Sequence, residues 1–499
     1  MRMKQKNGLY MALFALLMVL LFVPVIQQIW RPFSIRRLDG ATVKTEKPTL
    51  TYDCYKDMSY QAQLEKYVAE NFGFHESVIR LYNQYLWMFR KTYAFDVTIG
   101  KDKWLYPKKC VQDHYRQVSY EAENVNDDAS LKMKLDKDIE RLKKVQDMLE
   151  QRGTKMFLLI CPAKDVIYPE HLPTNGNFVM GDALRAVEYV PNALAEHGIN
   201  YVDMCDWFLK IKDTVSYPLF PMRAMHWSDI ACIHAADSVI RYMEQLTGKN
   251  MPNLKIGPMY PDETVYPDGD LEQSMNLMWG IRPPFQNYYA KVETDADSTA
   301  QKLNLLTIGD SFFKNWNYTL PMKDVFNAYP YYFYYSTVYF DPDHSHVSQV
   351  NLMEELDRAD IVMLSYSATQ LYEINRGFLS QALLQLSAKH PSNLDEILKG
   401  IKQTMESNEP WFALLKEKAE KQGKPLEQVM DEDARYVFYQ NPEKYVMNAA
   451  LEQIKRNIRN NPEWYESQLQ KAKQTGKDIE QVMDEDALYI LNQEPEKYF

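Results

Sequence analysis

The sequence predicts an α/β fold with a doubly wound, mostly parallel sheet. Its central part alternates apolar runs, which suit strands buried on both faces, with amphipathic stretches that suit helices. The connections between them are short, as in successive βαβ units. We expect strands within 154–164, 200–204, 303–309 and 359–367, and helices over 129–151, 183–198 and 229–246.

The N-terminus has the pattern of a membrane anchor. Basic residues precede a nearly uninterrupted apolar stretch from Leu9 to Ile26, and Trp30 follows just outside it. About 20 apolar residues span a bilayer, and tryptophan favours the membrane interface. No small-residue cleavage site follows, so the pattern predicts an uncleaved signal anchor over 1–33. A short basic N-terminus usually stays in the cytoplasm, which predicts a single-pass membrane protein with its main body outside the cytoplasm.

Three further segments precede the predicted sheet. Residues 34–56 are basic, contain Pro48 and lack periodicity, which indicates a linker. The apolar residues of 57–89 recur at helical spacing and predict a helix or a pair of helices. Residues 97–107 predict a β-hairpin, with Gly100 in its turn.

The C-terminal part is predicted to be helical. Residues 371–400 form a helical connection, and 401–446 and 454–499 are two copies of one repeat. Both copies contain "EQVMDEDA", and Trp411 in the first corresponds to Trp464 in the second. Each copy predicts a helical hairpin with a glycine C-cap between its helices. The acidic run lacks the ligand spacing and central glycine of a calcium loop, so a solvated helix face is the better interpretation.

Charge and cysteine content limit the possible functions. The net charge of −11 and the absence of a concentrated basic face argue against a general nucleic-acid binder. The five cysteines cannot all pair, although one or two disulfides are possible in an exported chain. Cys161 and Cys205 lie in apolar runs and are expected to be buried. No Cys/His spacing indicates a zinc site, and we expect neither a metal nor a nucleotide cofactor.

The candidate nucleophile is Ser311, which follows an apolar strand in the triplet Gly309-Asp310-Ser311. A nucleophilic serine is best placed at a sharp strand exit, where backbone N–H groups can stabilise an oxyanion. The carboxyl ends of parallel strands are also where α/β sheets bind ligands. Asp310 is expected to bond backbone amides in the turn, and Asn315 is a candidate side-chain donor to the oxyanion.

The best candidate base is His226, in a loop just before Ser228, which is a plausible N-cap of the next helix. The alternative is an ordinary surface histidine. His344 and His346 are rival bases because they lie in a polar loop close to Ser311 in sequence.

Several motifs together resemble a known family. "NFGFHESVIRLYN", "IGKDKWLY", "CPAKDVIYPEHLP", "MHWS" and "IGDSFF" occur here in the order found in SGNH-like acyltransferases related to the alginate O-acetyltransferases, and especially in the DHHW family. The resemblance covers roughly residues 50–370 and implies an SGNH-hydrolase-like α/β domain over 57–370. It also implies a membrane-anchored, periplasm-facing enzyme that transfers an acyl group, usually acetyl, to a carbohydrate polymer. Such proteins work beside a membrane-bound O-acyltransferase.

The resemblance also assigns roles to individual residues. It implies that Ser311 is the nucleophile and that His226 is the base. Lys164 and Tyr168 lie in a motif of the resemblance and are candidate substrate-binding residues. Trp227 either packs the loop that holds His226 or stacks on a sugar ring.

The chain departs from the family pattern at position 224, where Ala224 replaces the aspartate that orients the histidine. Loss of that carboxylate from a triad lowers turnover by about 10⁴-fold. Three explanations remain open. A Ser-His dyad works with a backbone carbonyl or another acid, the protein is a non-catalytic glycan-binding scaffold, or it is a carbohydrate esterase. Asp229 is near His226 in sequence but points along the following helix.

Two smaller departures and one aromatic segment complete the analysis. Ser367, Ala368 and Thr369 occupy a region where the family usually carries Glu and Arg, and Lys103 stands where glycine is more usual. The tyrosine-rich stretch 327–340 predicts either a strand with one buried face or a glycan-facing surface.

Overall fold

The protein is described by a computed structural model. It describes residues 2–40, 45–94, 96–117, 125, 127–174, 178–262, 267–295, 298–389, 394–440 and 442–498. Parts of three predicted segments lie outside these residues: 41–44 of the linker, 390–393 of the helical connection, and residues 441 and 499 of the repeats.

A seven-stranded sheet forms the centre of the molecule, as the sequence predicts. Its order is β12-β11-β9-β13-β3-β4, with β10 beside β9, and the pairs are parallel except for β11 with β12. The strands are β3 (Lys155–Cys161), β4 (Tyr201–Asp203), β9 (Leu303–Gly309), β10 (Phe326–Ala328), β11 (Tyr331–Phe333), β12 (Thr337–Tyr339) and β13 (Ile361–Ser367).

The register brings three strand ends to one edge of the sheet. β13 lies between β3 and β9, and Ser365 stands opposite both Leu159 and Gly309. The carboxyl ends of the three central strands therefore meet where Ser311 begins the next helix.

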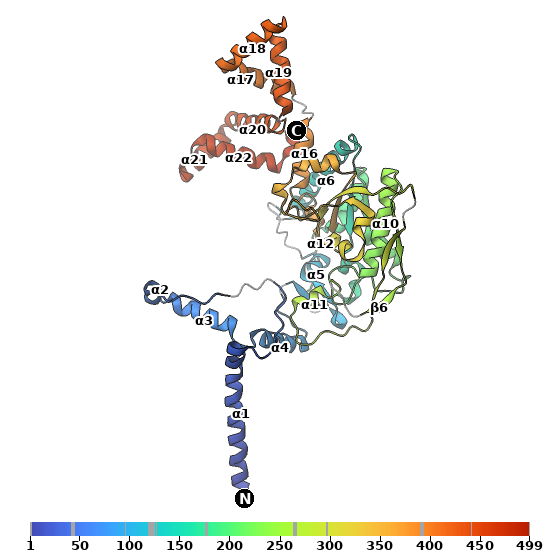
Figure 1. Cartoon of the computed structure of the whole chain (residues 1–499), viewed down its shortest axis with the longest axis vertical. Coiled ribbons are helices and arrows are strands. Elements are labelled where there is room, and N and C mark those ends of the chain that lie inside the picture. The colour runs from blue at the N-terminus through green and yellow to red at the C-terminus, as the bar shows by residue number, and fades with distance from the viewer. Residues whose placement is uncertain are drawn as a thin grey trace.

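Helices cover both faces of the sheet, so the central strands are buried on both sides (Figure 1). One face packs against α6 (Asp128–Glu150), α8 (Ala186–Glu196), α15 (Leu352–Arg358) and α16 (Phe378–Lys389). The other packs against α9 (Met204–Ile211), α10 (Asp229–Thr247), α12 (Ser311–Lys314), α13 (Trp316–Thr319) and α14 (Met322–Val325). Leu158 and Leu159 of β3 enter opposite cores, which explains the continuous apolar run in the sequence.

The predicted hairpin at 97–107 is observed. β1 (Val97–Ile99) pairs antiparallel with β2 (Leu105–Pro107), and helix α5 (Lys108–His114) follows. Lys103 has a positive φ of 65°, a conformation that glycine adopts without steric cost, so the geometry explains why glycine suits this position. Two small sheets were not predicted: β5 (Asn253–Ile256) with β8 (Val292–Asp295), and β6 (Tyr260–Asp262) with β7 (Asn287–Tyr289).

The tyrosine-rich stretch contains the end of β10 together with β11 and β12, and the buried tyrosines lie in β11. Tyr331 and Tyr332 point into opposite cores and are almost fully buried. Tyr334 and Tyr335 form the turn between β11 and β12 with φ values of 50° and 49°. Of the two alternatives, a strand with buried side chains therefore applies to β11, which is buried on both faces and not on one.

The N-terminal helices lie apart from the sheet. Helix α1 (Arg2–Trp30) contains an apolar span, Tyr10–Trp30, with a mean hydropathy of 2.4. This is the length and composition of a membrane anchor or a signal sequence. The predicted pair of helices over 57–89 is observed as α3 (Ser59–Asn71) and α4 (His75–Met88), preceded by the short α2 (Tyr52–Lys56).

The C-terminal repeats are three-helix units, so the predicted hairpins are incomplete. The first contains α17 (Leu394–Ser407), α18 (Glu409–Gln422) and α19 (Leu426–Gln440), and the second contains α20 (Pro442–Asn460), α21 (Pro462–Thr475) and α22 (Ile479–Gln493). Gly423 and Gly476 end α18 and α21 at positive φ, as the C-cap prediction requires. Each repeat has its own apolar core.

Candidate active site

Ser311, His226 and Asp270 form a continuous hydrogen-bonded chain. His226 Nε2 lies 2.7 Å from Ser311 Oγ, and His226 Nδ1 lies 2.5 Å from Asp270 Oδ2. His226 is 6% exposed, so water is largely excluded from its ring. This is the arrangement of nucleophile, base and orienting acid that hydrolases and acyltransferases with a catalytic serine use.

The turn after β9 fixes the nucleophile. Gly309 lies so close to the Ser365 carbonyl of β13 that a Cβ atom there would collide with it. Asp310 caps α12 by accepting from Phe312 N–H at 3.1 Å, and it also accepts from Ser367 N–H at 2.6 Å. The prediction that Asp310 bonds backbone amides in the turn is therefore confirmed.

Apolar packing holds the loop that carries His226. The His226 ring lies 4.9 Å from the ring of Phe312, the residue after the nucleophile. Trp227 is fully buried and packs edge-on against Phe312 at 5.4 Å. Ser228 caps α10 and donates to Pro218 O at 2.6 Å. Trp227 thus packs this loop, and its burial leaves no ring face for a sugar.

Lys164 contacts the same loop from the interior of the protein. Its Nζ atom is fully buried and donates to four backbone carbonyls at 2.7 to 3.0 Å, those of Leu105, Pro221, Met222 and Ala224. Burial lowers the pKa of Lys164 to about 7, whereas the surrounding carbonyls favour the charged ammonium. The structure places Lys164 under the segment before His226, without the exposure that a substrate-binding role requires.

Asp270 is the functional residue that the sequence did not reveal. Its Oδ1 accepts from the N–H groups of Met225 at 2.8 Å and Leu271 at 2.6 Å, so the carboxylate is fixed on the loop of His226. It begins α11 (Asp270–Ser274), within a polar turn that lacks any apolar periodicity. The explanation that another acid holds His226 fits this geometry, and that acid is Asp270 and not Asp229.

A second carboxyl lies close to this acid. Asp268 is almost fully buried and accepts from Tyr289 O–H at 3.0 Å. Burial, together with the charges of Asp229 and Asp270, raises the pKa of Asp268 to about 8. Of the two carboxyls, Asp270 is the one that contacts the imidazole.

The other predicted residues lie around this centre. The hydroxyl oxygen of Tyr168 accepts from Leu219 N–H at 3.2 Å, and its ring packs on Trp104, so Tyr168 also supports the loop. Asn315 is buried at the end of α12. His344 pairs with Asp341 at 2.8 Å and His346 with Ser348, whereas the imidazole on Ser311 is that of His226.

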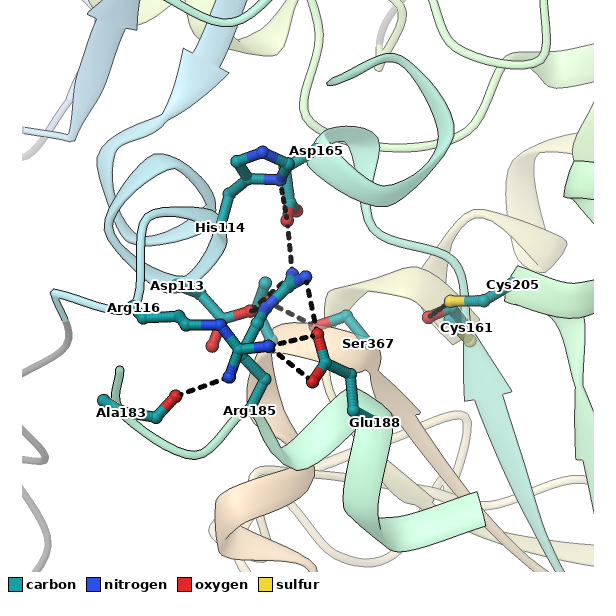
Figure 2. A network of polar contacts seen from close by, with 11 residues as sticks. Asp113, His114, Arg116, Cys161, Asp165, Ala183, Arg185, Glu188, Cys205 and Ser367 are labelled. Atoms are coloured by element: carbon teal, nitrogen blue, oxygen red, sulfur yellow. Dashed lines mark hydrogen bonds and ion pairs between the residues drawn. The ribbon is translucent and has the colours of Figure 1, made fainter. Parts of the chain in front are cut away.

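A buried polar network anchors the helix that carries Lys164, α7 (Lys164–Ile167). Figure 2 shows Arg185 between Asp113 and Asp165, with Nη2 2.9 Å and 2.8 Å from their carboxylates. Asp165 is fully buried, and burial raises its pKa to about 7. The network links α5 and α7 to the segment before α8, so it fixes the position of α7, which carries Lys164.

Among the described residues there is neither a disulfide bond nor a group of side chains suited to a metal ion. The five cysteines are unpaired, and Cys161 and Cys205 are buried as predicted, although Cys205 lies in α9 and not in a strand. Within the described ranges, no three His, Cys, Asp or Glu side chains are grouped to hold a metal ion.

The family match covers this whole catalytic centre. Residues 97–323 match the family model described as the SGNH hydrolase-like domain of the acetyltransferase AlgX. This segment of the chain is similar to the SGNH hydrolase-like domain of AlgX, and we call residues 97–323 the AlgX-type domain. Ser311, His226 and Asp270 all lie inside the AlgX-type domain, and the C-terminal repeats lie outside it.

Individual proteins and solved structures are also similar to this chain. The probable alginate O-acetylase AlgJ of Pseudomonas aeruginosa is 24% identical over 252 residues, which are 46% of this chain and 59% of that protein. Among solved structures, the O-acetyltransferase domain of Pseudomonas putida AlgJ is 14% identical, with 58% of this chain and 99% of that chain covered and a TM-score of 0.38. AlgX of Pseudomonas aeruginosa is 11% identical, with 58% and 67% covered and a TM-score of 0.37.

Proposed function

We propose that this protein is an O-acyltransferase that moves an acetyl group onto an extracytoplasmic polysaccharide through an ester of Ser311. The observation that carries the proposal is the unbroken chain from Ser311 Oγ through His226 to Asp270 Oδ2. The AlgX-type domain that contains it supports acetyl as the group and a polysaccharide as the acceptor.

The first half-reaction loads the serine. Ser311 Oγ attacks the carbonyl carbon of the acetyl donor while His226 Nε2 takes the hydroxyl proton. Asp270 Oδ2 accepts from His226 Nδ1–H and stabilises the imidazolium. The backbone N–H of Ser311 would form part of the oxyanion hole. The donor leaving group departs with the proton from His226, which leaves acetyl-Ser311.

The second half-reaction transfers the group. A sugar hydroxyl loses its proton to His226 Nε2 and attacks the acetyl carbon, and the proton returns to Ser311 Oγ as the sugar ester leaves. Water in place of the sugar gives ester hydrolysis, so the same three residues serve an esterase. The choice depends on whether the site holds a sugar against acetyl-Ser311.

The proposed setting is the periplasmic face of the inner membrane, with α1 as a single-pass anchor. A membrane-bound O-acyltransferase would supply the acetyl group across the membrane, and the carbohydrate polymer would be the acceptor. No metal, nucleotide or other cofactor enters this mechanism. The apolar span of α1 supports the anchoring.

The test separates an enzyme from a scaffold. Chromosomal Ser311→Ala and His226→Ala variants should abolish O-acetylation of the cell's polysaccharide, while immunoblots show wild-type amounts of the protein. The matched control is Ser345→Ala, because Ser345 is exposed and lies outside the hydrogen-bonded chain. Normal acetylation in both point variants, together with its loss on deletion of the gene, would contradict catalysis and indicate a scaffold.

A second assay separates transfer from hydrolysis. Purified protein is mixed with p-nitrophenyl acetate and an oligosaccharide of the acetylated polymer, and mass spectrometry follows the sugar. A transferase adds one acetyl group to the oligosaccharide. Release of acetate with an unmodified sugar would identify an esterase.

A further inference from the structure

Helix α4 has two faces of different character. One face packs on the body of the protein: Trp87 and Arg80 are buried, Arg80 donates to Arg37 O at 2.6 Å, and Asn83 donates to Met275 O at 2.9 Å. The opposite face is apolar and exposed to solvent. We call it the α4 apolar face; its side chains are 49–74% exposed and belong to Val78, Leu81, Tyr82, Tyr85, Met88 and Phe89.

This face is continuous along the helix. Its members follow the i, i+3, i+4, i+7 spacing of a single stripe, so they form one surface. Monomeric soluble proteins rarely expose contiguous apolar patches of this kind without a partner. We therefore expect another surface to cover the stripe in the cell.

The position of α4 indicates which surface covers the stripe. The turn before α4 packs against the last turns of α1, where a Cβ atom on Gly73 would lie 2.8 Å from Gln28 N. The rings of Phe74 and Phe33 lie 5.9 Å apart at the same junction. The apolar span of α1 ends at Trp30. Helix α4 therefore begins at the level where a membrane-spanning α1 would leave the bilayer.

The arrangement of the elements orients the face. In Figure 1, α4 runs across the end of α1, with the α/β body on the far side. The body contacts α4 through Arg80, Asn83 and Trp87, so the α4 apolar face is turned away from it.

The composition of α4 suits a lipid surface. Tyrosine and aliphatic side chains share the face, as in helices that lie in the headgroup region. Tyr82 stacks on the exposed Tyr93 at 6.0 Å, which extends the aromatic surface beyond the helix. Exposed Arg90 and Lys91 follow the helix and provide positive charge for anionic headgroups.

We propose that α4 lies in the interface of the membrane that holds α1, with the α4 apolar face inserted among the headgroups. This proposal rests on α1 spanning a bilayer and not on the catalytic activity. It has a consequence for the site: Asn83 bonds the carbonyl of Met275, directly after the helix that begins with Asp270. The membrane contact would then hold the catalytic centre at one height above the bilayer.

The test measures the depth of single side chains in lipid. Full-length protein carrying Cys54→Ser and Tyr85→Cys is spin-labelled and reconstituted in vesicles of phosphatidylethanolamine and phosphatidylglycerol. Cys54 is replaced because it is half-buried, whereas the other four native cysteines are buried. Met88→Cys provides a second position on the face, and Lys144→Cys, on the exposed surface of α6, is the control.

The proposal predicts that molecular oxygen relaxes the labels at 85 and 88 more strongly than a water-soluble nickel chelate does, with the reverse order at 144. Nickel accessibility at 85 and 88 equal to that at 144 would overturn it. The proposal would also be overturned if the labels at 85 and 88 were accessible to the nickel chelate in lipid vesicles but protected from it in native membranes. That result would indicate that a protein covers the α4 apolar face. Circular dichroism confirms that each labelled variant is folded.

Discussion

At the scale of single residues, the central finding is that Asp270 places a carboxylate oxygen 2.5 Å from His226 Nδ1, whereas the family resemblance led us to look for this acid at position 224. Ala224 is buried, and its carbonyl is bound by Lys164. Asp270 approaches the imidazole from a different segment, and two backbone N–H groups fix its second oxygen. A carboxylate that could orient the histidine is thus in place, although it lies far from His226 in sequence.

Asp270→Asn tests this assignment. The amide cannot stabilise the imidazolium as the carboxylate does, so turnover of p-nitrophenyl acetate should fall by about 10³- to 10⁴-fold. Unfolding in urea should stay close to that of the wild type. The matched control is Asp229→Asn, which lies at the start of α10, nearer to His226 in sequence. Equal losses in the two variants would contradict the role of Asp270.

Asp268 predicts a dependence of stability on pH. Its pKa is about 8 in the folded protein, against about 3.9 in an unfolded chain. Between these values the folded state holds a proton that the unfolded state has released, so this group lowers the free energy of unfolding as pH rises. Asp268→Asn removes the effect.

The urea midpoint of Asp268→Asn, relative to the wild type, should therefore rise from pH 5 to pH 8. Asparagine keeps an acceptor for the Tyr289 hydroxyl, so the comparison isolates the titration. The same difference at both pH values would show that Asp268 has no elevated pKa.

The sequence predicted the nucleophile and base but not the acid, for a physical reason. Ser311 follows a buried strand and His226 precedes a helix cap, and both patterns are local. Asp270 lies in a polar turn, where an aspartate is ordinary, and only tertiary packing brings it to His226. Lys164 shows the converse error, because a charged residue in a family motif suggested substrate contact while its side chain lies in the interior.

At the scale of elements, the loop before His226 depends on buried support. Lys164 satisfies the carbonyls of Pro221, Met222 and Ala224 and joins them to Leu105 of β2. Such carbonyls cost free energy when they lack a donor. The loop is thus held by one side chain from α7.

Lys164→Met should destabilise the fold and misplace the base. Loss of the donor leaves several buried carbonyls unsatisfied, so the free energy of unfolding should fall by about 3 kcal/mol. Turnover of p-nitrophenyl acetate should fall as well, measured at a temperature where the variant is folded. Lys132→Met on the exposed surface of α6 is the control. Wild-type stability and turnover in Lys164→Met would refute the supporting role.

The sequence predicted the main elements well because their signals are strong. β3, β9 and β13 are apolar on both faces, and α6 and α10 end close to the predicted residues. The small sheets of β5 with β8 and β6 with β7 were missed because their strands are only three or four residues long and, apart from β7, partly or fully exposed. Such strands carry little periodicity.

At the scale of the whole molecule, the chain has three regions. Helix α1 would span the proposed membrane and α4 would lie on it, the AlgX-type domain holds the proposed catalytic centre, and the repeats extend from the side of α16 (Figure 1). The second repeat docks on the α/β domain through Lys137, which pairs with Glu494 at 2.9 Å. Each repeat has its own core, so we expect the repeats to be energetically separate from the site.

Trp411→Ala tests that separation. Trp411 packs in the core of the first repeat, so its loss should lower the stability of this unit by about 1–3 kcal/mol. Ester turnover should stay within twofold of the wild type, because the first repeat contributes no residue to the hydrogen-bonded chain. Trp464→Ala is the matched variant in the second repeat. A tenfold loss of turnover in Trp411→Ala would show that the repeats control the site.

The most direct test of the account is intact-mass detection of an acyl-serine. Purified full-length protein in detergent is incubated briefly with p-nitrophenyl acetate and quenched in acid, beside Ser311→Ala and Asp270→Asn. The account predicts a gain of one acetyl group in the wild type, no gain in Ser311→Ala, and much slower accumulation in Asp270→Asn. An adduct of the same size and rate in Ser311→Ala, or no adduct and no ester cleavage in the folded wild type, would contradict it.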